Sequence, residues 1–134
     1  MTAVFADTAY YVALLSRRDE YHASAYAYTA RFAGEFVTTA WVNLELANHL
    51  SASSHREAFV SFYNDLNGDS RVRIVPATQY LFERGLDLFA CRPDKVWSLT
   101  DCISFVVMQE QRLSDALTAD HHFAQAGFRV LLNP

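Results

Sequence analysis

Cysteine, glycine and long apolar runs are scarce in this sequence, and each shortage excludes a class of protein. Two cysteines are too few for a disulfide framework and are typical of free thiols in a reducing compartment. Four glycines provide no glycine-rich phosphate loop, and no Gly-x-Ser-x-Gly motif marks a serine hydrolase. The longest apolar runs, residues 9–15 and 103–108, are far shorter than the ~20 residues that cross a bilayer. Because the N-terminus also lacks the basic start of a signal peptide, we expect a cytoplasmic protein without membrane association.

Positive charge is also in short supply. Fifteen acidic residues outnumber eleven basic ones, for a net charge of −4, which is the wrong sign for binding nucleic acid by overall charge. Lys95 is the sole lysine, so the basic residues are almost all arginines. Arginine favours bidentate contacts with phosphate, so a local anion site remains compatible with the acidic total.

The chain has the size and composition of one folded domain. Its 134 residues are 51% hydrophobic, which is enough to bury a core and excludes a disordered chain. No linker or repeat divides it, so we expect a single domain over residues 1–134.

Strand and helix patterns alternate along the chain. Strands are predicted over residues 4–6, 35–38, 72–75, 116–118 and 128–132. Helices are predicted over residues 9–16, 22–32, 41–50, 56–66, 79–90, 103–112 and 120–126. Strands separated by helices form right-handed crossovers, which predicts an α/β sandwich with a central parallel sheet of four to five strands between helical layers.

Local signals mark several helix ends. Ser98 and Asp101 have the spacing of a capping box, and Thr39 can cap the helix that follows it. Gly34 and Gly127 are expected as left-handed residues after helices. The segment Asn67-Gly68-Asp69 is predicted to be a turn.

Acidic residues follow the predicted strands or begin helices. Asp7 and Asp120 come directly after strands, Asp101 lies in the first turn of a helix, and Glu45 lies within the helix after the second strand. The carboxyl ends of parallel strands meet at one sheet edge, where ligands bind in open α/β folds. Clustered carboxylates repel one another unless a hard cation such as Mg²⁺ neutralises them. These four acids are therefore candidate metal ligands.

A structural explanation competes with this one. Each of the three aspartates can serve as a helix cap, where an acid gains about 0.3–1 kcal/mol from the helix dipole. Glu45 can be an exposed residue. The adjacent His121 and His122 favour surface or capping roles, and the two cysteines lack the paired spacing of a zinc site.

Five segments, taken in order, resemble the PIN-domain ribonucleases, and most closely the VapC-type toxins of bacterial toxin–antitoxin modules. The segments are residues 4–8 (Val-Phe-Ala-Asp-Thr), 43–47 (Asn-Leu-Glu-Leu-Ala), 98–105 (Ser-Leu-Thr-Asp-Cys-Ile-Ser-Phe), 116–123 (Ala-Leu-Thr-Ala-Asp-His-His-Phe) and 126–128 (Ala-Gly-Phe). The resemblance covers essentially the whole chain. It implies the PIN fold, a three-layer sandwich around a parallel sheet.

The resemblance also implies roles for individual residues. Asp7, Glu45, Asp101 and Asp120 would be the catalytic acids that hold Mg²⁺, with Mn²⁺ as a substitute. The hydroxyls of Thr8 and Thr118 would support these acids. Many relatives carry a further acid two residues after the fourth aspartate, where this chain has His122.

The expected function is a Mg²⁺-dependent endoribonuclease that cleaves RNA phosphodiesters by metal-activated water. The resemblance implies a toxin, neutralised by a small antitoxin and acting on loops of tRNA or rRNA. Candidate RNA contacts are Arg17, Arg18, Arg92 and Lys95, because they lie near predicted helix ends. A homodimer is left open. The alternatives are a non-catalytic PIN-like interaction domain and a PIN nuclease in RNA processing that has no antitoxin.

Overall fold

The computed structural model describes residues 2–134, which form a five-stranded parallel sheet with the strand order β3-β2-β1-β4-β5. The strands are β1 (Ala3–Ala6), β2 (Glu35–Thr39), β3 (Val72–Val75), β4 (Asp115–Leu117) and β5 (Arg129–Val130). Each strand pairs with its neighbours in parallel, for example Val4 with Phe36 and Phe5 with Ala116. The predicted parallel sheet is confirmed.

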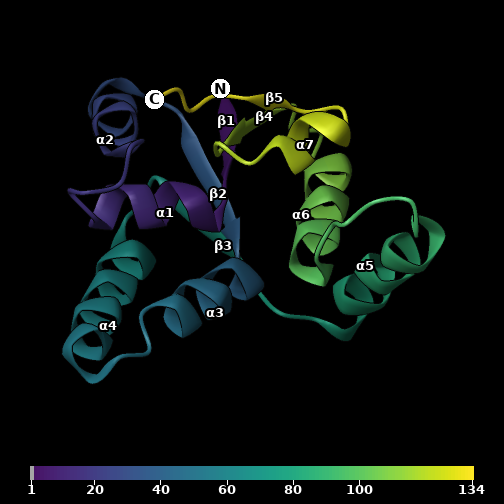
Figure 1. Cartoon of the computed structure of the whole chain (residues 1–134), viewed down its shortest axis with the longest axis horizontal. Coiled ribbons are helices and arrows are strands. Elements are labelled where there is room, and N and C mark those ends of the chain that lie inside the picture. Colours follow the sequence, from purple (N-terminus) through teal and green to yellow (C-terminus); the bar gives the residue numbers. More distant parts are fainter. Residues whose placement is uncertain (1) are drawn as a thin grey trace.

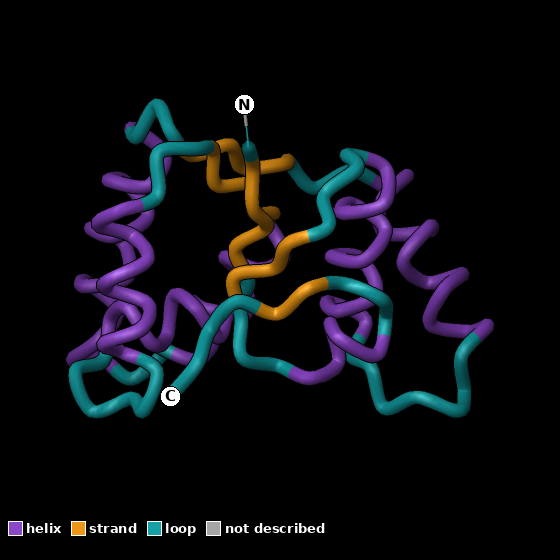
Figure 2. The backbone as a smooth tube through the Cα atoms, turned by 90° about the horizontal axis from the view of Figure 1, so that it is seen from above, coloured by secondary structure: helices purple, strands orange, loops and turns teal. Residues whose placement is uncertain are grey.

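Helices cover both faces of the sheet and make three layers (Figures 1 and 2). They are α1 (Thr8–Leu15), α2 (His22–Arg31), α3 (Ala40–His49), α4 (Ser53–Gly68), α5 (Gln79–Cys91), α6 (Leu99–Glu110) and α7 (His121–Gln125). One layer contains α1, α2 and α4, and the other contains α5, α6 and α7. Helix α3 lies at the end of the sheet, where it packs against both α1 and α6. Within residues 2–134, no helix is long and apolar enough to span a membrane.

Burial on both faces explains why the strands read as continuous apolar runs. The three consecutive residues Val4, Phe5 and Ala6 are all buried. Helix α6 is enclosed in the same way, with every residue from Asp101 to Met108 buried. The capping box of Ser98 and Asp101 is present at its start, and Thr39 caps α3 through the N–H of Val42. These local predictions are confirmed.

Two glycine predictions are wrong and one is confirmed. Gly127 has a φ of 99°, as expected of a left-handed residue. Gly34 does not; a Cβ there would lie 2.2 Å from the Thr2 carbonyl oxygen and 2.5 Å from the Phe32 ring, so the position needs glycine for space. The predicted turn at Asn67-Gly68-Asp69 is instead the last turn of α4, which continues to Gly68. Helical hydrogen bonding in the longest helix outweighs the turn preference of these residues.

The strand order determines where a site can form. The chain runs outward from β1 through β2 to β3, then crosses to the other side of β1 to form β4 and β5. The order therefore reverses between β1 and β4, and the crevice outside the carboxyl ends of such strands is where α/β folds bind ligands. Asp7 follows β1, and Asp120 follows β4 after two further residues.

Candidate active site

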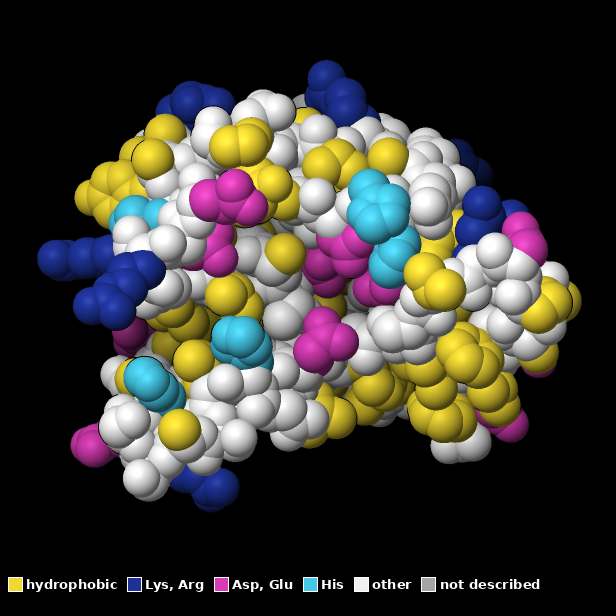
Figure 3. Space-filling model, viewed as in Figure 1, with side chains coloured by type: hydrophobic (Ala, Val, Ile, Leu, Met, Phe, Trp, Pro, Cys, Tyr) yellow, Lys and Arg dark blue, Asp and Glu magenta, His cyan; other side chains and the backbone are white. Residues whose placement is uncertain are grey.

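A cavity of about 310 Å³ at the carboxyl edge of the sheet brings all four predicted acids together. Asp7 enters it from the β1–α1 junction, Glu45 from α3, Asp101 from the first turn of α6, and Asp120 from the residue before α7. Acidic side chains gather in a hollow beside the histidines in the space-filling view (Figure 3). The remaining lining residues are Thr8, Ala9, Val12, Asp19, Tyr21 and Ala119.

Asp7 is the most buried of these acids, with 4% of its surface exposed. Its Oδ2 accepts a hydrogen bond from the Thr118 hydroxyl at 3.0 Å, and within the described chain its side chain makes no capping hydrogen bond to α1. Burial, together with the smaller effects of the negative charges of Asp101 and Glu45, raises the pKa of Asp7 from 3.8 to about 7. Asp7 occupies the N-cap position of α1, but side-chain capping does not account for its buried carboxylate.

Asp101 and Asp120 are both helix caps and members of the cluster. Asp101 accepts from the Ser98 N–H in the capping box, and Asp120 Oδ1 accepts from the His122 N–H at 2.9 Å. Burial and then the charge of Asp120 raise the pKa of Asp101. The capping explanation is correct for these two residues, but it leaves unexplained why two caps and a buried Asp7 share one cavity.

His122 also belongs to the site, which the sequence interpretation placed at the surface or in a cap. Its Nδ1 lies 3.2 Å from Asp101 Oδ2 and 3.4 Å from Asp120 Oδ1, and its side chain is only 18% exposed. His121 keeps the predicted exposed position, with 75% of its side chain accessible and Nδ1 3.9 Å from Asp120. The two adjacent histidines therefore differ in exposure and in their contacts with the acids.

Asp19 is a fifth acid at this cavity, and the sequence analysis missed it. It lies in the connection between α1 and α2, where its carboxylate accepts from the Tyr21 N–H at 2.8 Å. Nothing in its local pattern separates it from an ordinary turn aspartate. Asp19 lies near the other acids only because α1 packs at the edge of the sheet and so brings the α1–α2 connection to the cavity.

The chemistry of the cavity fits a divalent cation. Carboxylate and hydroxyl oxygens are hard ligands of the kind that Mg²⁺ and Mn²⁺ take. Thr8 Oγ1 is buried at the cavity and has no hydrogen-bond partner among residues 2–134, so a polar atom is left for a ligand or its water. Burial is the main cause of the raised pKa of Asp7 and the neighbouring carboxylates add to it, so a cation here would offset the cost of the ionised form.

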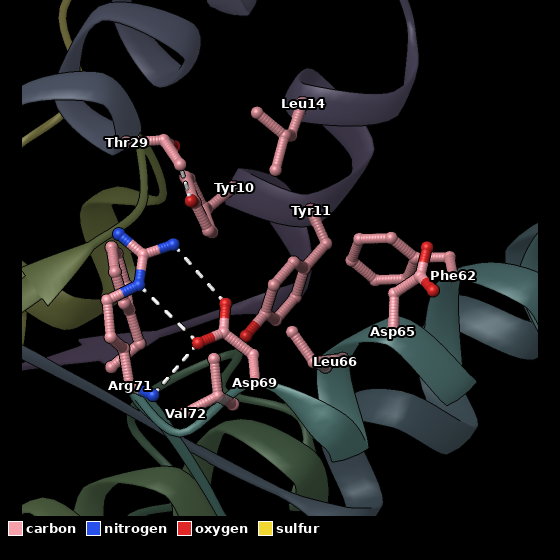
Figure 4. A pocket seen from close by; sticks show the side chains of 11 residues that line it. Tyr10, Tyr11, Leu14, Thr29, Phe62, Asp65, Leu66, Asp69, Arg71 and Val72 are labelled. Carbon is pink, nitrogen blue, oxygen red and sulfur yellow. Dashed lines mark hydrogen bonds and ion pairs between the residues drawn. The ribbon is translucent and has the colours of Figure 1, made fainter.

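A second cavity has a different character (Figure 4). Rings of Tyr10, Tyr11 and Phe62 form much of its wall. Asp65 and Asp69 also line it, and Asp69 is paired with Arg71 at 3.3 Å. This cavity therefore suits an apolar contact, whereas the sheet-edge cavity suits a cation.

Comparison with known families decides the identity of the fold. The PIN domain model matches residues 4–129. The chain belongs to the PIN domain family. Among solved structures, it resembles the crystal structure of VapC20 from Mycobacterium tuberculosis, a sarcin-ricin loop cleaving toxin, with a TM-score of 0.87 and 24% identity over 97% of this chain and 99% of that one. No curated protein matches this sequence.

The four candidate RNA contacts of this PIN domain fall into two groups. Arg17 and Arg18 are exposed in the segment after α1, directly before Asp19 of the acid cavity. Arg92 and Lys95 line another cavity, beside Trp97. Arg92 pairs with Asp94 at 3.0 Å and its guanidinium carbon lies 5.1 Å from the centre of the Trp97 ring.

Proposed function

We propose that this PIN domain is a divalent-metal-dependent endoribonuclease and the toxin of a toxin–antitoxin pair. The observation that carries the proposal is the buried Asp7, which shares a cavity with Glu45, Asp101 and Asp120 and, although it is the N-cap residue of α1, makes no side-chain capping hydrogen bond. A buried carboxylate among other acids costs stability unless a cation offsets it. Function, rather than folding, accounts for that arrangement.

Each acid has a distinct task in this proposal. Asp7 and Asp101 hold the principal Mg²⁺ or Mn²⁺, while Glu45 and Asp120 complete the site and orient water. Thr118 fixes Asp7 by donating to Oδ2 and fixes Asp120 by accepting from its N–H at 3.1 Å. The bound metal supplies water activation and offsets charge on the phosphate in the transition state.

We propose a loop of structured RNA, of the tRNA or rRNA class, as the substrate. An A-form duplex has a deep, narrow major groove, whereas a loop can splay one strand into a small cavity. The solved relative VapC20 is a toxin that cleaves the sarcin-ricin loop, which supports the same type of target here. We propose Arg17 and Arg18, which directly precede Asp19 of the cavity, as contacts to the RNA backbone, with Arg92 and Lys95 as further contacts.

We propose that the antitoxin binds a groove between α1, α3 and the start of α4. Its lining includes Val12, Leu15, Leu46 and Leu50, and Val12 also lines the acid cavity. An apolar helix bound in the groove can therefore extend a basic side chain into the adjoining acid cavity. That cation would lie where the metal would otherwise bind.

The alternative with support from the structure is a non-catalytic PIN domain, because Asp101 and Asp120 do form caps. Titration with Mn²⁺ separates the two. The nuclease proposal expects saturable binding that Asp7→Asn removes, together with RNA cleavage that EDTA stops. Binding unaffected by Asp7→Asn, or cleavage in EDTA, contradicts it.

A further inference from the structure

The position of His122 has a consequence for metal choice, and the inference rests on the proposed metal-dependent function. His122 Nδ1 faces two acids of the cluster at once, Asp101 Oδ2 at 3.2 Å and Asp120 Oδ1 at 3.4 Å. A charge-assisted N–H···O bond is typically shorter, about 2.7–2.9 Å. The nitrogen therefore lies between the two oxygens rather than bonding closely to either.

These separations are those of neighbouring ligands around one ion. Two ligand atoms that each lie about 2.1 Å from a cation are about 3.0 Å apart at a right angle and about 3.4 Å apart at the tetrahedral angle. Nδ1 has that spacing to each of the two carboxylate oxygens, and the ligand atoms of Asp120, His121 and His122 lie within 4.8 Å of one another. The buried Thr8 hydroxyl, unpartnered among residues 2–134, lines the same cavity and gives an independent sign of a ligand there.

The backbone holds the imidazole in this position. The His122 N–H donates to Asp120 Oδ1 at 2.9 Å, so the residue that presents the ring also fixes one of the neighbouring carboxylates. Phe123, the next residue, is fully buried and packs edge-on against Phe105 of α6 at 4.9 Å between ring centres. That contact ties α7 to the helix that carries Asp101.

We infer that His122 is a nitrogen ligand of the active-site metal in this chain. A nitrogen among carboxylate oxygens raises affinity for Mn²⁺, Co²⁺ and similar ions relative to Mg²⁺, because imidazole suits transition metals while Mg²⁺ prefers oxygen. His122 is thus a determinant of metal specificity. His121 also has a ligand atom within 4.8 Å of those of Asp120 and His122, but its side chain is 75% exposed and its Nδ1 lies 3.9 Å from Asp120, so it serves as the matched comparison.

Pulsed electron paramagnetic resonance of the full chain with bound Mn²⁺ tests the inference directly. We expect a ¹⁴N coupling of a directly bonded nitrogen in the wild type and in His121→Asn, and its loss in His122→Asn. Mn²⁺ affinity, measured by the signal of free Mn²⁺, should fall about tenfold or more in His122→Asn. His122→Asp should bind Mn²⁺ without the nitrogen coupling, and should bind Mg²⁺ more tightly relative to Mn²⁺ than the wild type does.

The outcomes separate this inference from the proposed function. Mn²⁺ that binds, depends on Asp7, and lacks the nitrogen coupling overturns the role of His122 and leaves the metal site intact. A coupling that is lost in His121→Asn but kept in His122→Asn also overturns it. Absence of Asp7-dependent Mn²⁺ binding overturns the proposed metal site and this inference together. Circular dichroism of each variant checks that the fold is retained.

Discussion

The Thr118 hydroxyl donates a hydrogen bond to Asp7 Oδ2 at 3.0 Å across 111 residues of chain. Thr118 Oγ1 also accepts a hydrogen bond from the Asp120 N–H at 3.1 Å, so one side chain connects the acid after β1 to the acid after β4. Thr118 is completely buried, and its two bonds orient groups that meet only in the folded state. It acts as a positioning residue.

We predict that Thr118→Val lowers RNA cleavage and Mn²⁺ affinity by about 10–100-fold, the range seen for residues that orient metal ligands. Valine has a similar shape, so the loss is that of the hydroxyl. Thr118→Ser restores both bonds and should recover most of the affinity and activity. Wild-type cleavage and affinity in Thr118→Val, or no recovery of either in Thr118→Ser, would contradict a role for the two hydrogen bonds.

Asp7 should make the metal-free protein less stable as the pH rises. Its pKa is about 7 in the folded chain and 3.8 ordinarily. The folded state therefore keeps a proton that the unfolded chain releases between these values, and stability falls by roughly 4 kcal/mol at most from about pH 4 to pH 7. Denaturant unfolding in EDTA should show that this fall is smaller in Asp7→Asn than in the wild type.

At pH 7 without metal, Asp7→Asn should therefore be the more stable protein, although it is inactive. Mn²⁺ should raise the melting temperature of the wild type and leave that of Asp7→Asn unchanged. The exposed Asp87 provides the control, since Asp87→Asn changes the same charge away from the cavity. A wild type that is more stable than Asp7→Asn in EDTA at pH 7 would contradict this prediction.

Water, rather than the ribose 2′-hydroxyl, should be the nucleophile in RNA cleavage. Products should then carry a 5′-phosphate and a 3′-hydroxyl, and EDTA should stop the reaction. End-labelling and mass spectrometry of the fragments distinguish these ends from a 2′,3′-cyclic phosphate. A cyclic end, formed in EDTA, would require a metal-independent mechanism.

The sequence predicted the site best where a residue's role depends only on the position of its backbone. Asp7, Asp101 and Asp120 could be placed because parallel strands and helix starts fix where their Cα atoms lie, whatever the packing. His122 could not, because its position as the second residue of α7 says nothing about which way its ring points. Contact of α7 with α6 turns that ring toward Asp101. Asp19 was missed for a similar reason, since a turn residue joins the site only through the packing of α1.

Arg17 and Arg18 should contribute more to RNA binding than Arg92 and Lys95. The first pair directly precedes Asp19 at the acid cavity, while Arg92 is paired with Asp94. Each phosphate contact with a single strand contributes about 0.7 to the slope of log K against log salt. The double variant Arg17→Ser/Arg18→Ser should reduce that slope, measured with catalytically inactive Asp7→Asn protein, more than Arg92→Ser/Lys95→Ser does. The reverse order would place the RNA on the α5–α6 side.

Leu15 should be needed for the antitoxin and dispensable for catalysis. It is 42% exposed and lines the groove between α1, α3 and α4, so an apolar helix would cover it. Leu15→Glu should put a charge into that contact and release the protein that co-purifies when the neighbouring small gene is co-expressed. Leu44 is 58% exposed on α3 but does not line the groove, so Leu44→Glu is a matched control. The two variants should cut RNA equally well, while only Leu15→Glu escapes neutralisation and arrests growth in the presence of the antitoxin. If both variants remain neutralised, or if Leu44→Glu is the one that escapes, the antitoxin binds a different surface.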